Sequence, residues 1–211
     1  YKDRVDAGRQ LARLLESHRG KDTLVLAIPN GGVVVGLAIA RALVCPLDLV
    51  VVRKIPIPWE PEAGFGAVTP DRTVILNRPL MRELGLREEE TEALAREVWR
   101  QIQKRVQKYG ASTQFPYLQG KWVILVDDGL ASGVTMEAAI TMVRKYRPAR
   151  ITVAVPTAHT SSFEHISSLV DEVICPDVRG GPYFAVADAY EDWRDLSDEE
   201  VITLLRGYNR G

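Results

Sequence analysis

The sequence predicts an α/β fold in which a central, mainly parallel sheet is flanked by helices. Short continuous runs of Val, Ile and Leu indicate strands that are covered on both faces, which is typical of parallel sheets. Longer segments with apolar residues at helical spacing separate these runs. The predicted strands are 23–28, 47–52, 123–126, 151–155 and 172–175.

Composition indicates an ordinary globular protein. The 211 residues are 46% hydrophobic and 26% charged, so we expect a single domain over 1–211. A net charge of −1 gives no reason to expect a nucleic acid as partner. The apolar run 33–46 is too short for a membrane span, and residues 1–10 lack the apolar core of a secretory signal. We therefore expect a cytoplasmic protein with no membrane partner.

Four helices are predicted from apolar spacing and capping residues. The segment 87–109 opens with three glutamates, closes with Lys and Arg, and presents one apolar stripe, so we interpret it as scaffold without chemistry. It dominates a predicted helical insertion over 78–110. Ser197 and Glu200 form a capping box at the start of a last helix. The predicted helices are 6–17, 33–43, 87–109 and 197–205.

Two segments are expected to be irregular. The segment 53–72 is rich in proline and glycine, and a long structureless run inside a compact domain is usually a functional loop or lid. The segment 176–189 combines glycines with aromatic residues. We expect a flexible lid at 53–72 and part of a ligand-covering hood at 176–211.

The segment 123–135 carries the main functional signal. A buried strand leads into two adjacent carboxylates, Asp127 and Asp128, which repel each other and cost energy to desolvate. A vicinal diol would offer each carboxylate a hydrogen bond. The small residues that follow expose backbone amides near a helix N-terminus, which favours an anion. The pattern therefore predicts a ribose 5-phosphate site, whereas an Asp-Asp turn that caps a helix would leave the second acid unexplained.

This segment resembles the signature of type I phosphoribosyltransferases, enzymes that use phosphoribosyl pyrophosphate (PRPP). The family's Thr-Gly-x-Thr loop corresponds to Ser132-Gly133-Val134-Thr135 here. The resemblance implies a Rossmann-like fold with a small hood. It also implies that Asp127 and Asp128 act as catalytic residues, by binding the ribose hydroxyls and, through substrate, Mg²⁺. By the same resemblance, the residues around the 5-phosphate are Gly129, Leu130, Ala131, Ser132, Gly133, Val134 and Thr135.

A second glycine-containing loop resembles the pyrophosphate loop of that family. It follows the first strand and reads Pro29-Asn30-Gly31-Gly32. The family commonly has a basic residue before the glycines and a non-proline cis peptide; here Asn30 stands in the basic position. Arg53 and Lys54 are expected to end the second strand at the same edge of the sheet and to neutralise the leaving pyrophosphate as catalytic residues. A plain turn and a solvated pair of cations are the respective alternatives.

The acceptor base is expected to lie under a hood formed by 1–20 and 176–211. The segment 181–193 loosely resembles the C-terminal part of hypoxanthine phosphoribosyltransferases. That resemblance implies stacking of the base on Phe184, with Tyr183 beside it, and a weak magnesium role for Asp192. Both aromatic residues could equally pack in the core. No lysine follows the strand 151–155, which argues against ordinary 6-oxopurine specificity.

The expected reaction transfers the 5-phosphoribosyl group of PRPP to a nitrogenous base, with Mg²⁺ as cofactor and pyrophosphate as product. The resemblance also implies a homodimer. A regulator that senses PRPP or a nucleotide without turnover is the alternative, and a hydrolase that uses water as acceptor is a third possibility. The three histidines and two cysteines are expected to be structural, with the cysteines buried as free thiols. These residues are His18, His159, His165, Cys45 and Cys175.

Overall fold

All five predicted strands lie in one parallel sheet in the computed structural model, which describes residues 1–208 except the side chains of residues 61 and 62. The strand order is β2-β1-β6-β7-β9, and every neighbouring pair is parallel. The predicted fold class is therefore confirmed. The strands are β1 (Thr23–Ala27), β2 (Leu47–Leu49), β6 (Trp122–Val126), β7 (Arg150–Ala154) and β9 (Glu172–Ile174).

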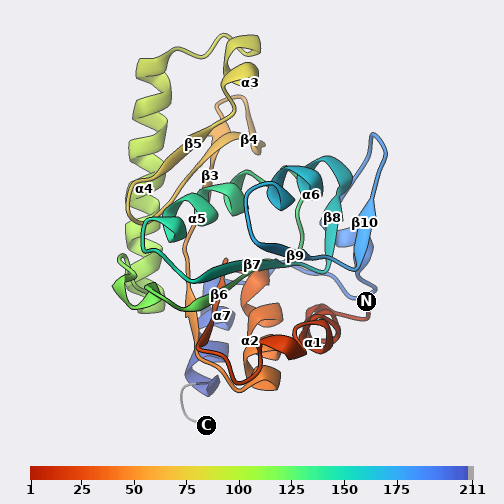
Figure 1. Cartoon of the computed structure of the whole chain (residues 1–211). Helices are drawn as coiled ribbons and strands as arrows, with labels where there is room; N and C mark the ends of the chain where they lie inside the picture. Colours follow the sequence, from red (N-terminus) through yellow and green to blue (C-terminus); the bar gives the residue numbers. More distant parts are fainter. Residues whose placement is uncertain (209–211) are drawn as a thin grey trace.

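Helices cover both faces of this sheet (Figure 1). Side chains alternate along each strand, so β6 sends Val123 and Leu125 to one face and Ile124 and Val126 to the other. The first face packs against α5 (Val134–Arg144) and α6 (Thr160–Ser167), and the second against α1 (Arg4–Leu14) and α2 (Gly31–Leu43). Each such buried aliphatic side chain contributes about 1.5–3 kcal/mol, which explains why the runs are apolar throughout.

The segment 53–72 is largely β-structure, so the prediction of an irregular loop was wrong. It contains β3 (Arg53–Ile57) and β4 (Glu60–Val68), which form a three-stranded antiparallel sheet with β5 (Val74–Leu76). Pro56 is tolerated because β3 is an edge strand and its pairing with β4 shifts register on both sides of that proline. The proline content therefore marked an edge strand.

The second sheet packs against the predicted helical insertion, which comprises α3 (Arg78–Glu83) and α4 (Glu88–Tyr109). The predicted stripe of α4 is confirmed at Val98, Ile102 and Val106, which are buried against Ile55 and Phe65 of the sheet. Figure 1 shows α4 as a long helix at one side of the molecule. Within residues 1–208, no helix combines the length and apolarity needed to cross a membrane.

The C-terminal segments complete the fold. The prediction of an irregular 176–189 was partly wrong, because β10 (Asp177–Arg179) pairs in parallel with β8 (Thr157–His159). The capping box of α7 (Asp198–Tyr208) is confirmed: the Glu200 amide donates to Ser197 Oγ, and the Ser197 amide donates to Glu200 Oε2. Three 3₁₀ turns are η1 (Glu16–His18), η2 (Pro116–Leu118) and η3 (Val186–Ala189).

A charged turn ties the second sheet to the helical layer of the first. Asp71, between β4 and β5, accepts hydrogen bonds from Thr69 and Thr73 and lies 2.8 Å from Lys145 Nζ at the end of α5. Burial raises the pKa of Asp71, but the bonds from Lys145, Thr69 and Thr73 outweigh it and lower the pKa to about 2. The ionised carboxylate therefore stabilises the folded state.

We predict that Asp71→Asn lowers the free energy of unfolding by about 1–3 kcal/mol at pH 7, because bonds to a charged acceptor are lost. The folded-state pKa lies below the ordinary value of 3.8, so this stabilisation is present above pH 3.8 and is lost as pH falls toward 2. Urea unfolding of both proteins at pH 7 and pH 3 measures the difference. Asp22→Asn removes the exposed pair with Lys121 and serves as control. An equal loss in both variants would contradict the assignment.

Candidate functional site

The two predicted ligand loops meet at the carboxyl edge of the parallel sheet. The loop 29–32 follows β1 and the acidic pair follows β6, and these strands are neighbours. The peptide bond between Pro29 and Asn30 is cis. An ideal Cβ on Gly31 would lie 1.7 Å from Asp128 Oδ2, so this loop approaches the acid closely because Gly31 has no side chain.

The two carboxylates differ in their environment. Asp127 Oδ1 accepts a hydrogen bond from the Asp128 amide at 2.8 Å. Burial, reinforced by the charge of Asp128, raises the pKa of Asp127 well above its ordinary value. Asp128 instead has a cationic partner, since its Oδ2 lies 2.8 Å from Arg4 Nε. The pair is therefore an anionic centre balanced by one buried arginine.

Arg4 was missed by the sequence analysis. It begins α1, and its side chain is only 9% exposed. The guanidinium also donates to the Arg194 carbonyl oxygen at 2.9 Å and lies 3.8 Å from the centroid of the Trp193 ring. A signal was present: Arg4, Ala7 and Leu11 share the buried stripe of α1, where an arginine needs a partner.

The segment 129–135 is a tight loop that runs into α5. Gly133 has φ +74°, a left-handed conformation suited to glycine, and α5 begins at Val134. The amide of Leu130 donates to the Thr157 carbonyl oxygen and its side chain is buried, so Leu130 anchors the loop to β8 and offers no amide to an anion. Ala131 and Ser132 are exposed. The first turn of α5, including Thr135, directs backbone amides without intrahelical partners toward this place.

The prediction that Arg53 and Lys54 end a strand of the parallel sheet was wrong, because both residues begin β3 of the second sheet. Neighbouring residues of a strand point to opposite faces, so the two cations cannot act as one pair. Arg53 lines a cavity of about 440 Å³ together with Lys104, Arg105 and Asp198. Burial and the charge of Arg105 lower the pKa of Arg53, which indicates a crowded cationic environment. Lys54 is exposed.

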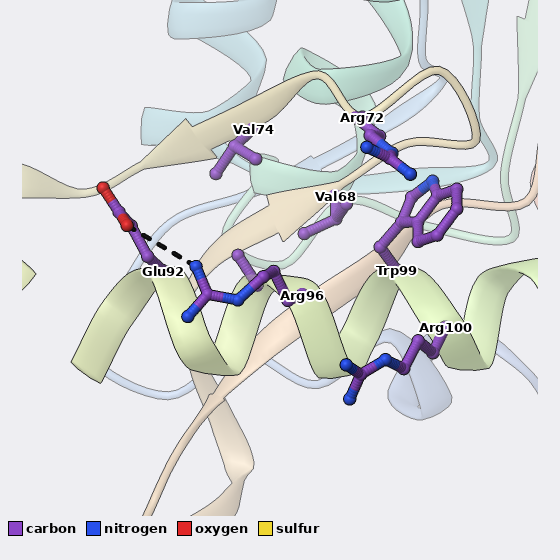
Figure 2. Close-up of a pocket in the computed structure, with 8 residues that line it drawn as sticks. Val68, Arg72, Val74, Glu92, Arg96, Trp99 and Arg100 are labelled. Carbon is purple, nitrogen blue, oxygen red and sulfur yellow. Dashed lines mark ion pairs between the residues drawn. The ribbon is translucent and has the colours of Figure 1, made fainter. Parts of the chain in front are cut away.

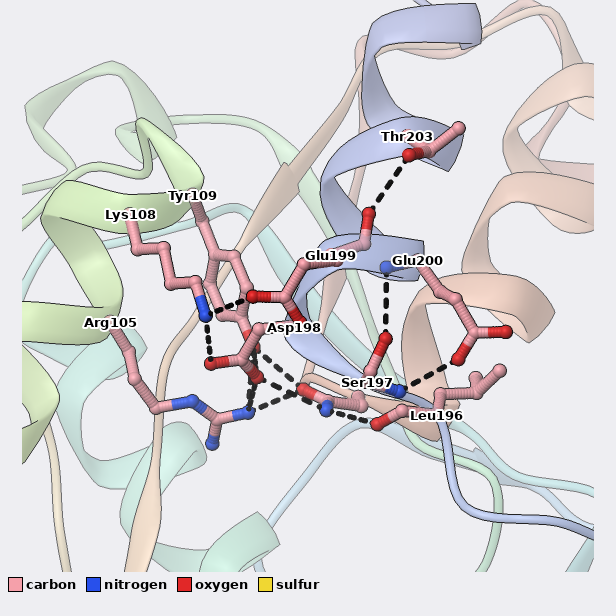
Figure 3. A network of polar contacts seen from close by, with 10 residues as sticks. Arg105, Lys108, Tyr109, Leu196, Ser197, Asp198, Glu199, Glu200 and Thr203 are labelled. Atoms are coloured by element: carbon pink, nitrogen blue, oxygen red, sulfur yellow. Dashed lines mark hydrogen bonds and ion pairs between the residues drawn. The ribbon is translucent and has the colours of Figure 1, made fainter.

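Asn30 connects this cavity to the glycine loop (Figure 3). Its Oδ1 lies 2.5 Å from Arg105 Nη2 and 2.7 Å from the Tyr109 hydroxyl, and its Nδ2 donates to the Leu196 carbonyl oxygen at 2.6 Å. Asp198 Oδ1 accepts from Arg105 at 2.7 Å and from Tyr109 at 2.6 Å. Although burial raises the pKa of Asp198, these bonds outweigh it and hold the pKa below its ordinary value.

This network corrects two interpretations. The helix 87–109 was predicted to be scaffold without chemistry, yet α4 supplies Arg105 and Tyr109 to the edge of the site. Asn30 was predicted to face pyrophosphate, but its side chain holds α4 and α7. The backbone amides of Gly31 and Gly32, in the first turn of α2, are what the loop can offer an anion.

The C-terminal hood segment lies over the acidic loop. An ideal Cβ on Gly129 would lie 2.5 Å from Val186 Cγ1, and the Tyr190 hydroxyl donates to the Asp128 carbonyl oxygen at 2.6 Å. Phe184 is half-buried with its ring centroid 5.8 Å from that of His159. The core-packing alternative is wrong for Tyr183, which is 94% exposed.

No metal cluster stands beside the acids in the described chain. Asp192 is exposed, and its amide donates to the Lys2 carbonyl oxygen. Among residues 1–208, no group of three or more His, Cys, Asp or Glu side chains is placed to hold a metal ion. A metal would therefore depend on ligands supplied by a substrate and water.

The histidines and cysteines have structural environments. His18 is buried with its Nε2 3.1 Å from Thr152 Oγ1, and His165 Nε2 lies 2.9 Å from Glu137 Oε2. Both cysteines are free thiols and are partly rather than fully buried. Burial raises the pKa of Cys45 to about 11 and that of Cys175 to about 12, so neither is a thiolate at neutral pH.

A separate cavity of about 370 Å³ lies between α4 and the second sheet (Figure 2). Its wall includes Trp99, with the Arg72 guanidinium 3.9 Å from the ring centroid. Arg96 and Arg100 point to this side of α4, but Arg96 pairs with Glu92 and Arg100 with Glu97. Its lining comes from elements remote in sequence from the acidic pair, so we place the candidate site at the carboxyl edge of the parallel sheet.

Comparisons with known proteins agree with this location. The family model described as "Phosphoribosyl transferase domain" matches residues 69–188, more than half of the chain. Curated proteins from two Mycobacterium tuberculosis strains, provisionally named phosphoribosyl transferases, are 35% identical over 205 residues. Those matches cover 97% of this chain but 46% of the relatives, so the chain spans about half their length. A crystal structure of TT1426 from Thermus thermophilus is 34% identical with a TM-score of 0.79, covering 99% of this chain and 98% of that one.

We predict that Gly31→Ala displaces the Asp128 carboxylate, because the new methyl group would overlap Oδ2. Overpacking of this kind costs about 1–3 kcal/mol of unfolding free energy, measured by urea unfolding followed by circular dichroism. Gly207→Ala on α7 is the control, since no atom lies within 4 Å of its ideal Cβ and alanine favours the helix. Equal stability of Gly31→Ala and the unmodified protein would show that this approach is looser than described.

Proposed function

The chain belongs to the phosphoribosyltransferase family, and we propose that it transfers the 5-phosphoribosyl group of PRPP to a nitrogenous base, with Mg²⁺. The observation that carries the proposal is the meeting of an acidic pair with two amide-bearing loops at one edge of the sheet. Ligands of open α/β sheets bind at the carboxyl ends of the strands. This arrangement suits a sugar with an anion at each end.

The sugar and its 5-phosphate are assigned to the loop after β6. Asp127 and Asp128 would accept hydrogen bonds from the ribose hydroxyls. The amides at the start of α5, with the hydroxyls of Ser132 and Thr135, would hold the phosphate. Leu130 would support this loop through its bond to β8, since its own amide is occupied.

Pyrophosphate is assigned to the space beside the loop 29–32. The amides of Gly31 and Gly32 open α2 and favour an anion. Arg53 and Arg105 lie at the neighbouring cavity, where their mutual repulsion would be relieved by a negative ligand. These groups would stabilise the charge that develops on the leaving pyrophosphate.

In the proposed reaction, the bond between ribose C1 and the pyrophosphate oxygen breaks, and its electron pair leaves with pyrophosphate. A lone pair on the base nitrogen forms the new bond to C1, and that nitrogen loses a proton. The protein contributes mainly positioning and charge stabilisation. The hairpin of β3 and β4 is proposed to cover the site and exclude water, and Phe184 is proposed to contact the base.

Magnesium fits the chemistry of the donor set. Mg²⁺ prefers carboxylate oxygens, substrate phosphates and water, and Asp127 and Asp128 provide adjacent carboxylates. Within the described chain no side-chain cluster could hold the ion alone, so substrate oxygens would supply most of its ligands. When bound, the ion would neutralise part of the pyrophosphate charge.

The test is pyrophosphate release from PRPP and Mg²⁺ with a panel of purine, pyrimidine and non-nucleobase acceptors. We predict base-dependent release that falls about 100-fold or more in Asp128→Asn, because the amide cannot replace the charge that orients the ribose hydroxyls. Asp22→Asn, at the opposite edge of the sheet, should retain full activity.

The panel also separates the alternatives. PRPP binding by calorimetry without release of pyrophosphate would indicate a PRPP sensor. Release that is equal with and without a base would indicate a hydrolase. Unchanged activity in Asp128→Asn would overturn the diol assignment.

A further inference from the structure

The geometry points to a role for Arg4 that belongs to the catalytic site rather than to the stability of α1. Three contacts fix its guanidinium: Nε on Asp128 Oδ2, Nη1 on the Arg194 carbonyl oxygen, and the face of the Trp193 ring. Arginine forms such forked and stacked contacts at the same time, whereas lysine does not. The orientation of the group is therefore determined by two distant segments of the chain.

Arg4 lies where the two ligand loops converge. The ideal Cβ position of Gly31 is 2.9 Å from Arg4 Nε and 1.7 Å from Asp128 Oδ2, so the arginine touches both the glycine loop and the acid. The glycine loop itself, Pro29-Asn30-Gly31-Gly32, contains no basic residue. Arg4 thus brings a cation from α1 to a loop that has none of its own.

The partners of Arg4 connect it to the hood. Tyr190 bonds to the Asp128 carbonyl oxygen, and the Asp192 amide donates to the Lys2 carbonyl oxygen. The segment 190–194 and the start of α1 therefore form a clasp around the Arg4–Asp128 pair. A burial of this kind is costly for an arginine unless its partner is required where it stands.

We propose that Arg4 is a positioning residue for the phosphoribosyl reaction: it holds Asp128 by Oδ2, so that Oδ1 is directed to the ribose hydroxyls of PRPP. The inference rests on the proposed function and assigns Arg4 no direct contact with the reacting atoms. It places the origin of Asp128's orientation in α1 and the hood, outside the sequence motif.

A double-mutant cycle tests this role in the pyrophosphate-release assay. We expect Arg4→Met to lower kcat/KM for PRPP by about 30-fold or more, the scale for breaking a buried ion pair, mainly through a raised KM. If Arg4 acts through Asp128, adding Arg4→Met to Asp128→Asn should change kcat/KM by less than about 3-fold, because the acid it positions is already disabled. Arg4→Lys keeps the charge and should have an intermediate KM.

The controls separate positioning from folding. Arg9→Met changes an exposed arginine of the same helix and should leave KM unchanged. A purely structural role would lower the fraction of active enzyme, and hence kcat, with KM unaltered. If Arg4→Met fails to fold, Arg4→Lys takes its place in the cycle.

Each outcome bears on a distinct claim. Multiplicative losses in the double variant, or a normal KM in Arg4→Met, overturn the role of Arg4 while the proposed function stands. An unmodified protein that neither binds nor uses PRPP overturns the proposed function, and the role of Arg4 with it.

Discussion

Two neighbouring carboxylates at the end of a buried strand impose the constraint on which this site depends. Their mutual repulsion and desolvation must be offset, and the structure does so unequally. Asp127 is buried with a raised pKa, whereas Asp128 is paired with Arg4. The chain thus stabilises a charged centre at the sheet edge without cancelling it. A neutral pair would be easier to bury but could not bind a sugar hydroxyl as strongly.

Parallel strand order turns this local feature into a site. Because β1 and β6 are neighbours and point the same way, the loops that follow them start at one edge. Gly31 allows them to touch, and the N-terminal ends of α2 and α5 bring their amides to the same place. Anion binding here arises from backbone geometry, which agrees with a protein whose net charge is only −1.

The sequence predicted the features that local chemistry determines. All five parallel strands and the stripe of α4 followed from apolar periodicity, and the acids and glycine loops followed from residue types next to strand ends. It failed at β3 and β4, where prolines on an edge strand resembled a loop. It also missed Arg4, Arg105 and Tyr109, because each meets the site only through long-range packing. Buried charge on the stripe of α1 was the one local signal for Arg4.

The missed residues explain how the variable parts of the chain can influence the sugar site. Arg4 reaches Asp128 from α1 and is held by the segment 193–194, while Asn30 is held by α4 and α7. The two ligand loops are therefore oriented from outside the parallel sheet, by elements that also form the proposed hood. A change in the hood that moved Trp193 would be felt at Asp128 through Arg4, with no change in the acidic motif itself. Acceptor binding and PRPP binding would then be coupled through packed and hydrogen-bonded contacts, which is the physical form that coupling between neighbouring sites requires.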